Sequence, residues 1–202
     1  MLLIPVILAQ MLASTAPSQT PASARGVLES ATGDVDGDGR PDAIRLEQRR
    51  TGVFLVVETA AGRRTEKGLG IEPLSFSLEG TATRLALADV NGDGTPEILA
   101  AAAVGDRGLL FVLGWNGAWE LAPLISLRSG DDAFVADAGY DPESIRVERS
   151  GRVELATRRK SANGLRATRD TWEWSRDQQD FVWTDAVAKA APFDPAPGFR
   201  AE

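Results

Sequence analysis

A nine-residue acidic segment occurs twice in this chain and constrains its fold more than any other feature. Residues 34–42 read DVDGDGRPD, and residues 89–97, which begin 55 positions later, read DVNGDGTPE. Carboxylates crowded into one short loop repel one another unless a cation neutralises them. Although Asp and Gly are also ordinary turn residues, turns alone explain neither the spacing of the acids nor its repetition. The pattern therefore predicts two metal-binding loops.

Calcium is the metal that these loops fit. Ca²⁺ takes six to eight oxygen ligands from a flexible loop, here the side chains at positions 1, 3, 5 and 9 and the carbonyl at position 7. The predicted ligands of the first loop are Asp34, Asp36, Asp38, the Arg40 carbonyl and Asp42, and those of the second loop are Asp89, Asn91, Asp93, the Thr95 carbonyl and Glu97. Because Asn91 stands where the first loop has Asp36, the second loop carries one negative charge fewer. We therefore expect the first loop to bind calcium more tightly.

The residues around the loops predict strands rather than helices. A helix–loop–helix site needs a bidentate Glu at position 12, but Arg45 and Ala100 occupy that position. Residues 43–47 alternate between apolar and charged side chains, as in a half-buried strand. Residues 98–104 indicate a more buried strand, although so many alanines also suit a helix. Residues 85–88 form a short apolar run before the second loop, so each unit is strand, calcium loop, strand.

This unit resembles the FG-GAP/VCBS repeat of integrin-like β-propellers. The resemblance covers residues 31–46 and 86–101, and residues 130–202 contain no acidic loop of this kind. It implies propeller-like antiparallel sheets whose edges are held by structural calcium.

Further strands are predicted along the rest of the chain. They are a strand at 53–58 and hairpins pairing 109–115 with 118–121, 145–148 with 152–155, and 171–174 with 181–184. The last two hairpins suggest a third, calcium-free unit at about 140–185. We therefore expect an all-β domain of about three repeat units of about 55 residues. An ordinary propeller has four to eight blades, so the sheets are either open or closed tightly on themselves.

Composition excludes several classes of function. The 202 residues contain no cysteine and no histidine, so disulfides and the usual catalytic triad are absent. The net charge of -7 argues against nucleic acid or an anionic membrane surface as a partner. Residues 2–13 form an apolar run too short to span a bilayer.

The same apolar run, followed by the Ala22-Ser23-Ala24 cleavage pattern, predicts a signal peptide at residues 1–24. A buried N-terminal strand or helix is the alternative. We expect a β domain at 25–185, an Ala/Pro-rich tail at 186–202, and a protein that is periplasmic or secreted, where calcium is plentiful. The oligomeric state is left open.

Two classes of function fit these features. The first is an exported protein-interaction module, in a narrower form an inhibitor or immunity protein that binds a basic, lysozyme-like hydrolase. Its candidate contact surface is the acidic stretch that ends at Glu143, with Asp131, Asp132, Phe134, Asp137 and Tyr140. Aromatic rings among carboxylates suit a basic partner, although an ordinary solvated connection is an alternative.

The second class is a polysaccharide-active enzyme or carbohydrate-binding protein. Such an enzyme needs two carboxylates facing each other across a sugar, and no pair is identifiable from the sequence. Trp172 and Trp174 share one face of a predicted strand and could stack on a sugar, but paired aromatics also fill sheet cores. We therefore expect no catalytic residues.

Overall fold

The computed structural model describes residues 26–115, 121–124, 133–137, 142–161 and 164–184. Within these ranges the chain is β-strand and connecting turns, and its one helical element is the short 3-10 turn η2 (Pro142–Ser144). No helix among these residues is long and apolar enough to cross a membrane. The predicted signal peptide and C-terminal tail lie outside the described residues.

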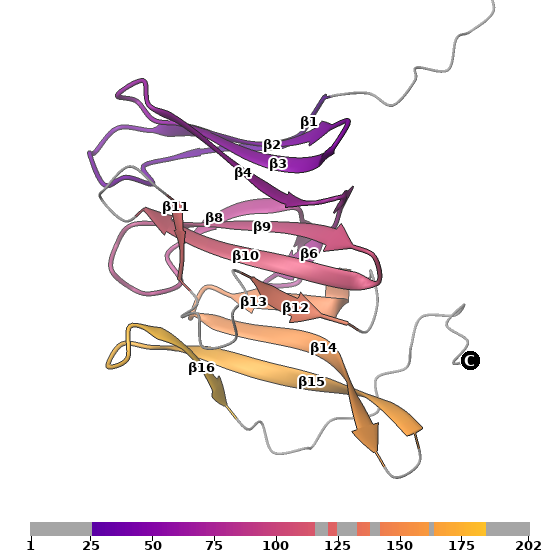
Figure 1. The fold of residues 1–202 in the computed structure, drawn as a ribbon. Coiled ribbons are helices and arrows are strands. Elements are labelled where there is room, and N and C mark those ends of the chain that lie inside the picture. Colours follow the sequence, from indigo (N-terminus) through magenta and orange to yellow (C-terminus); the bar gives the residue numbers. More distant parts are fainter. Residues whose placement is uncertain (1–25, 116–120, 125–132, 138–141, 162–163, 185–202) are drawn as a thin grey trace, which may run out of the picture.

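Three sheets are stacked face to face, from top to bottom in Figure 1. Sheet 1 contains β1 (Gly26–Gly33), β2 (Asp42–Arg49), β3 (Gly52–Glu58) and β4 (Arg64–Gly70). Sheet 2 contains β5 (Glu72–Pro73), β8 (Leu85–Ala88), β9 (Glu97–Val104), β10 (Arg107–Trp115), β11 (Leu121–Pro123) and β12 (Phe134–Ala136). Sheet 3 contains β6 (Phe76–Leu78), β7 (Thr81–Thr83), β13 (Ile145–Glu148), β14 (Arg152–Ser161), β15 (Gly164–Ser175) and β16 (Asp180–Thr184).

Sheet 2 is the middle layer, and its central strand β9 is buried on both faces. Successive side chains of a strand point to opposite faces, so β9 contributes alternately to two separate hydrophobic cores. The side chains in the core with sheet 1 are Ile98, Ala100 and Ala102, and those in the core with sheet 3 are Leu99, Ala101 and Ala103. All six are at most 2% exposed. Double burial explains why this strand is a continuous apolar run rather than an alternating one.

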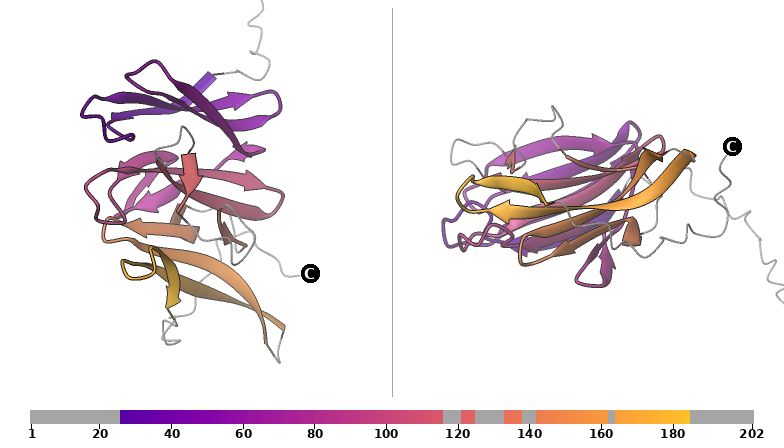
Figure 2. Two further views of the ribbon diagram at one scale, coloured as in Figure 1. Left: turned by 60° about the vertical axis from the view of Figure 1, so that its left-hand side comes forward. Right: turned by 90° about the horizontal axis from the view of Figure 1, so that it is seen from below.

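Strands that are distant in sequence complete the edges of sheets 2 and 3. Strands β5 and β8 pair with different parts of β9, and β11 and β12 pair with different parts of β10. The β6–β7 hairpin lies between β5 and β8 of sheet 2 in the sequence but pairs with sheet 3, through the parallel contact of β6 with β13. This hairpin therefore connects the first half of the chain to the last sheet (Figure 2).

The two outer faces of the stack are charged. On sheet 1, three arginines and three glutamates form a network of ion pairs, which contains Arg45, Arg49, Arg64, Glu47, Glu58 and Glu66. On the outer side of sheet 3, the Arg152 guanidinium lies 2.7 Å from the Glu154 carboxylate. A further blade would have to bury these charges against a neighbouring sheet, at a large desolvation cost. The described strands accordingly form an open stack, and no closed propeller ring is present among them.

The predicted all-β, antiparallel class is confirmed. Residues 98–104 form a strand rather than a helix, and both hairpins of sheet 3 are observed, with Val147 opposite Val153 and Trp174 opposite Phe181. Most of the predicted strand at 118–121 lies outside the described residues. The count of about three repeats stays a prediction. The three sheets do not correspond one to one to three repeat units, because sheets 2 and 3 also contain strands from outside the predicted units.

A glycine marks a close approach between sheets 1 and 2. A Cβ added to Gly70 would lie 2.8 Å from the Ala103 carbonyl oxygen and 2.9 Å from the Ala102 Cβ. We predict that Gly70→Ala lowers the free energy of unfolding by about 1–3 kcal/mol, because a tightly packed site cannot accept another methyl group without strain.

Gly68→Ala is the matched control, since an added Cβ in the same strand meets the Phe54 ring at an ordinary 3.6 Å. It should change the free energy of unfolding by no more than about 0.5 kcal/mol. Urea titrations measure both variants, and equal unfolding midpoints would contradict the close packing of β4 on β9.

Candidate metal centre

The two acidic loops lie next to each other at one edge of the stack, on the left in Figure 1. The first connects β1 to β2, and the second connects β8 to β9. The Thr95 hydroxyl is 3.8 Å from the point where a Cβ of Gly37 would lie, so the loops approach each other closely. A cavity of about 160 Å³ between them is lined by Asp36 from the first loop, Asp93 and Glu97 from the second, and Trp115 from β10.

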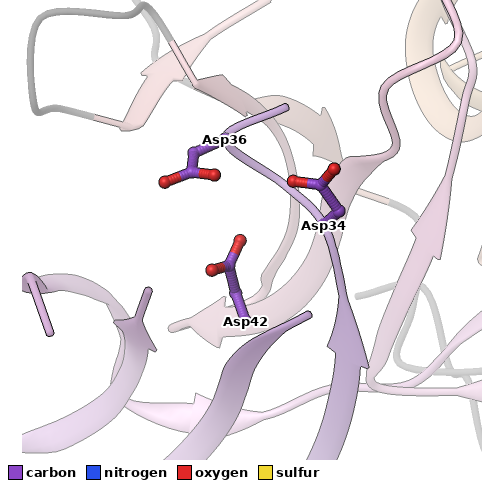
Figure 3. A group of neighbouring side chains, drawn as sticks. All are labelled: Asp34, Asp36 and Asp42. Carbon is purple, nitrogen blue, oxygen red and sulfur yellow. The ribbon is translucent and has the colours of Figure 1, made fainter. Parts of the chain in front are cut away.

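In the first loop, the structure brings three predicted ligands together. Carboxylate oxygens of Asp34, Asp36 and Asp42 lie within 4.8 Å of one another and point toward a common centre (Figure 3). Asp42 is only 1% exposed. Its two oxygens accept hydrogen bonds from the backbone N–H groups of Val35 (2.9 Å) and Ala60 (2.8 Å). Those bonds fix the Asp42 side chain and attach the loop to the turn that follows β3.

Backbone N–H groups also hold the Asp34 carboxylate in place. Its oxygens accept hydrogen bonds from the N–H groups of Asp38 (3.0 Å) and Gly39 (2.8 Å). Gly39 has a φ of 84°, a conformation that favours glycine and lets its N–H turn inward. Partial burial raises the pKa of Asp36, and the negative charges of neighbouring aspartates raise it further. A cation at the common centre would relieve this repulsion.

The fourth predicted carboxylate, Asp38, lies outside this group. Its Oδ2 accepts hydrogen bonds from the Arg40 guanidinium, from Nη2 at 2.6 Å and from Nε at 3.1 Å. These bonds with Arg40 lower the pKa of Asp38. Three of the four side chains that the sequence predicted as ligands therefore converge, and the spacing gave no sign of the Arg40 ion pair.

In the second loop, an amide takes part in holding the carboxylates. The Asn91 Nδ2 donates hydrogen bonds to Glu97 (2.7 Å) and Asp93 (3.0 Å). Asp89 accepts hydrogen bonds from the N–H groups of Gly92, Asp93 and Gly94, much as Asp34 does in the first loop. The two loops thus share one backbone scaffold, but their side chains pair differently.

Glu97 is the buried acid of the second loop, at 3% exposed. Its Oε2 accepts a hydrogen bond from the Val90 N–H at 2.9 Å. Burial raises the pKa of Glu97 to about 7, with a smaller contribution from the nearby charge of Asp93. Without a metal, this carboxyl group therefore holds a proton up to near-neutral pH.

Turns of sheet 3 support the second loop from below. The Val90 carbonyl oxygen is 2.3 Å from the point where a Cβ of Gly151, in the β13–β14 turn, would lie. The Arg176 guanidinium, from the β15–β16 turn, lies against Gly92. Nothing in the spacing of the acidic motif predicted these contacts, which depend on how the sheets stack.

The other predicted site residues have different roles. Phe134, expected as an exposed anchor for a partner, is a core residue: it is 4% exposed and packs edge-on against Trp172 and Phe181. The expectation failed because the charged neighbours of this residue in sequence conceal strand β12, which pairs with β10. Trp172 and Trp174 pack against the core between sheets 2 and 3, which supports the core interpretation over sugar stacking.

Within the acidic stretch, Asp137 makes structural hydrogen bonds. Its backbone N–H donates to the Ala156 carbonyl, and its carboxylate accepts from the Arg158 N–H. Asp131, Asp132 and Tyr140 lie outside the described residues.

Comparison with known families supports part of the sequence interpretation. Residues 34–100 match the model of the FG-GAP-like repeat, and this match spans both acidic loops. That repeat is a non-enzymatic, β-rich protein-interaction module, in agreement with the expectation that the chain is not an enzyme. Searches of curated proteins and of solved structures return no significant match.

The raised pKa of Glu97 predicts how pH affects the metal-free protein. The folded state keeps the Glu97 proton up to about pH 7, whereas the unfolded chain loses it near 4.5. Between these values the folded state binds more protons, so the contribution of Glu97 to stability is complete below about pH 4.5 and is lost as pH rises through 7.

Glu97→Gln keeps a hydrogen-bond acceptor at this position but does not titrate. In metal-stripped protein, the free energy of unfolding of the parent should fall as pH rises from 5 to 8, whereas that of the variant should not. The variant should therefore gain up to about 3 kcal/mol relative to the parent, because a difference of one pKa unit corresponds to about 1.4 kcal/mol. Urea titrations at each pH measure this difference. A constant difference across the range would show that Glu97 ionises normally.

Proposed function

We propose that this chain is an exported protein-interaction module whose two acidic loops bind calcium and thereby stabilise the sheet stack. The observation that carries the proposal is the convergence of the Asp34, Asp36 and Asp42 carboxylates within 4.8 Å of one another, in a region that matches the FG-GAP-like repeat. An all-oxygen, strongly acidic donor set of this kind suits a hard cation such as Ca²⁺ rather than a transition metal.

Each loop contains enough oxygen atoms to hold an ion. In the first loop, Asp34, Asp36, Asp42 and the Arg40 carbonyl would be the ligands. A carboxylate oxygen that accepts one backbone hydrogen bond keeps lone pairs for a metal. In the second loop, Asp89, Asp93 and Glu97 would bind together with Asn91, whose amide can turn its oxygen toward the ion in place of its nitrogen. Calcium would neutralise the mutual repulsion of the carboxylates and displace the proton from Glu97.

The position of the loops favours a structural role for the ions. The first loop is bonded to the β3–β4 turn through Asp42 and Ala60. It contacts the second loop at Gly37 and Thr95, and the second loop contacts sheet 3 at Gly151. Rigid loops at this edge would therefore hold all three sheets in register.

The proposed partner is a basic protein, in the narrowest form a lysozyme-like hydrolase that this module inhibits. The net charge of -7 favours association with such a partner. A cavity of about 360 Å³ lies where the acidic stretch ends, beside the β6–β7 hairpin. Its charged lining consists of Glu79, Glu143, Glu148, Glu154 and Arg146. Export is supported by the apolar run at residues 2–13 and the Ala22-Ser23-Ala24 pattern.

Calcium should raise the thermal stability of the protein. Saturating one site at one hundred times its Kd contributes about 2.7 kcal/mol to the free energy of unfolding. We therefore expect chelation to lower the melting temperature and added calcium, but not an equal ionic strength of sodium, to restore it. An unchanged melting curve for protein shown to be metal-free would contradict calcium binding.

The partner prediction is tested with a basic lysozyme-type hydrolase and its peptidoglycan substrate. We expect the protein to slow the hydrolase without degrading peptidoglycan itself. Removing two of the four glutamate charges of this cavity, by Glu79→Gln with Glu148→Gln, should slow association and reduce its salt dependence, because these exposed carboxylates would steer a basic partner.

The matched control is Glu72→Gln with Asp106→Asn, which removes the same charge from exposed positions in and beside sheet 2. Equal association rates for the two double variants would place the partner surface elsewhere. Turnover of peptidoglycan by the protein alone would favour the enzyme class instead.

A further inference from the structure

We propose that Arg40 is a built-in competitor for calcium in the first loop, so that this side chain, and not only the number of carboxylates, sets the affinity of the loop. The inference rests on the calcium binding proposed above and concerns how one residue of the same loop regulates it.

Arg40 holds the Asp38 carboxylate with three donors. The guanidinium donates from Nη2 at 2.6 Å and from Nε at 3.1 Å to Oδ2, and the backbone N–H donates at 2.8 Å to Oδ1. Both oxygens of Asp38 are therefore engaged by one residue. Asp38 is also absent from the group in which the other three carboxylates of the loop converge.

This pairing opposes a metal in two ways. If Asp38 is to bind the ion through Oδ2, the two hydrogen bonds that this oxygen accepts from the guanidinium must be broken or shared. Because arginine does not lose its proton in proteins, its positive charge also stays beside the loop and repels an incoming divalent cation. Arg40 thus carries out part of the neutralisation that calcium would otherwise provide.

The second loop provides an internal comparison. Thr95 takes the place of Arg40, and Asp93 is paired with the neutral Asn91 amide at 3.0 Å. The Asp93 Oδ1 accepts a hydrogen bond from the Thr95 N–H at 2.8 Å, just as Asp38 does from Arg40. The backbone arrangement at position 5 is therefore the same in both loops, and what differs is the cationic side chain.

The number of carboxylates and the Arg40 ion pair have opposite effects on the calcium affinity of the first loop. The first loop has one more negative charge than the second, which favours calcium, but its arginine already occupies one carboxylate. Replacing Arg40 by threonine, the residue at the same position of the second loop, should free Asp38 and raise the calcium affinity of the first loop. The geometry thus assigns to position 7 two functions, a backbone carbonyl that serves as ligand and a side chain that limits affinity.

The test is isothermal calcium titration of full-length protein in which Asp93→Ala weakens the second loop. In this background, Arg40→Thr should bind calcium about two- to fivefold more tightly than the parent, the range expected from losing one exposed ion pair. The gain should shrink at high salt, which screens exposed charges. Arg40→Gln, with a long neutral side chain, should reproduce the gain, and Arg40→Lys should give a smaller one.

The reciprocal variant is Thr95→Arg in a background where Asp38→Ala weakens the first loop, and it should bind calcium more weakly than its parent. Melting curves of metal-free protein establish that each variant is folded.

If the parent binds calcium but Arg40→Thr and Arg40→Gln bind it equally well, the inference is overturned and calcium binding stands. If neither parent nor variants bind calcium, the proposed function fails and the inference fails with it. If Arg40→Thr and Arg40→Gln bind calcium more tightly than the parent, and Thr95→Arg binds it more weakly than its own parent, the role of Arg40 is supported.

Discussion

The stack depends on one strand that is buried on both of its faces. Strand β9 contributes alternate side chains to two cores, one shared with sheet 1 and one with sheet 3. Four of its residues are alanine, and sheet 1 approaches so closely that an added Cβ at Gly70 would contact the Ala102 Cβ at 2.9 Å. Larger side chains along β9 would push the layers apart. Because a small, continuous apolar strand can sit between two sheets, a short chain obtains two hydrophobic cores without closing into a ring.

The same stacking places the acidic loops. Each loop leads into a strand of its sheet at the same edge of the stack. Stacking therefore brings the two loops into contact at Gly37 and Thr95. It also places the turns of sheet 3 against Val90 and Gly92 of the second loop. Repulsive carboxylates therefore gather where three sheets meet. The outer faces end in ion pairs instead of apolar surface, which fits a stack that stops at three layers. A cation at the loops would then act on the whole stack and not only on one turn.

Much of this arrangement could be predicted from the sequence because it is local. The spacing of the acids predicted that Asp34, Asp36 and Asp42 converge, and alternation predicted the hairpins of sheet 3. What could not be predicted depends on contacts between distant segments. The β6–β7 hairpin joins sheet 3 through a parallel pairing with β13, a strand far along the chain. Phe134 was misjudged because its charged neighbours concealed a short buried strand, and the Arg40 ion pair competes with the role that spacing assigned to Asp38.

A crystal structure of the protein grown with calcium would show directly whether the acidic loops are calcium sites built into the sheet stack, as we propose. We expect an ion in the first loop with six to eight oxygen ligands at about 2.3–2.6 Å, among them carboxylate oxygens of Asp34, Asp36 and Asp42. Anomalous scattering distinguishes calcium from water at that position. Density showing only water between these carboxylates, at calcium concentrations in the millimolar range, would contradict calcium binding by the first loop.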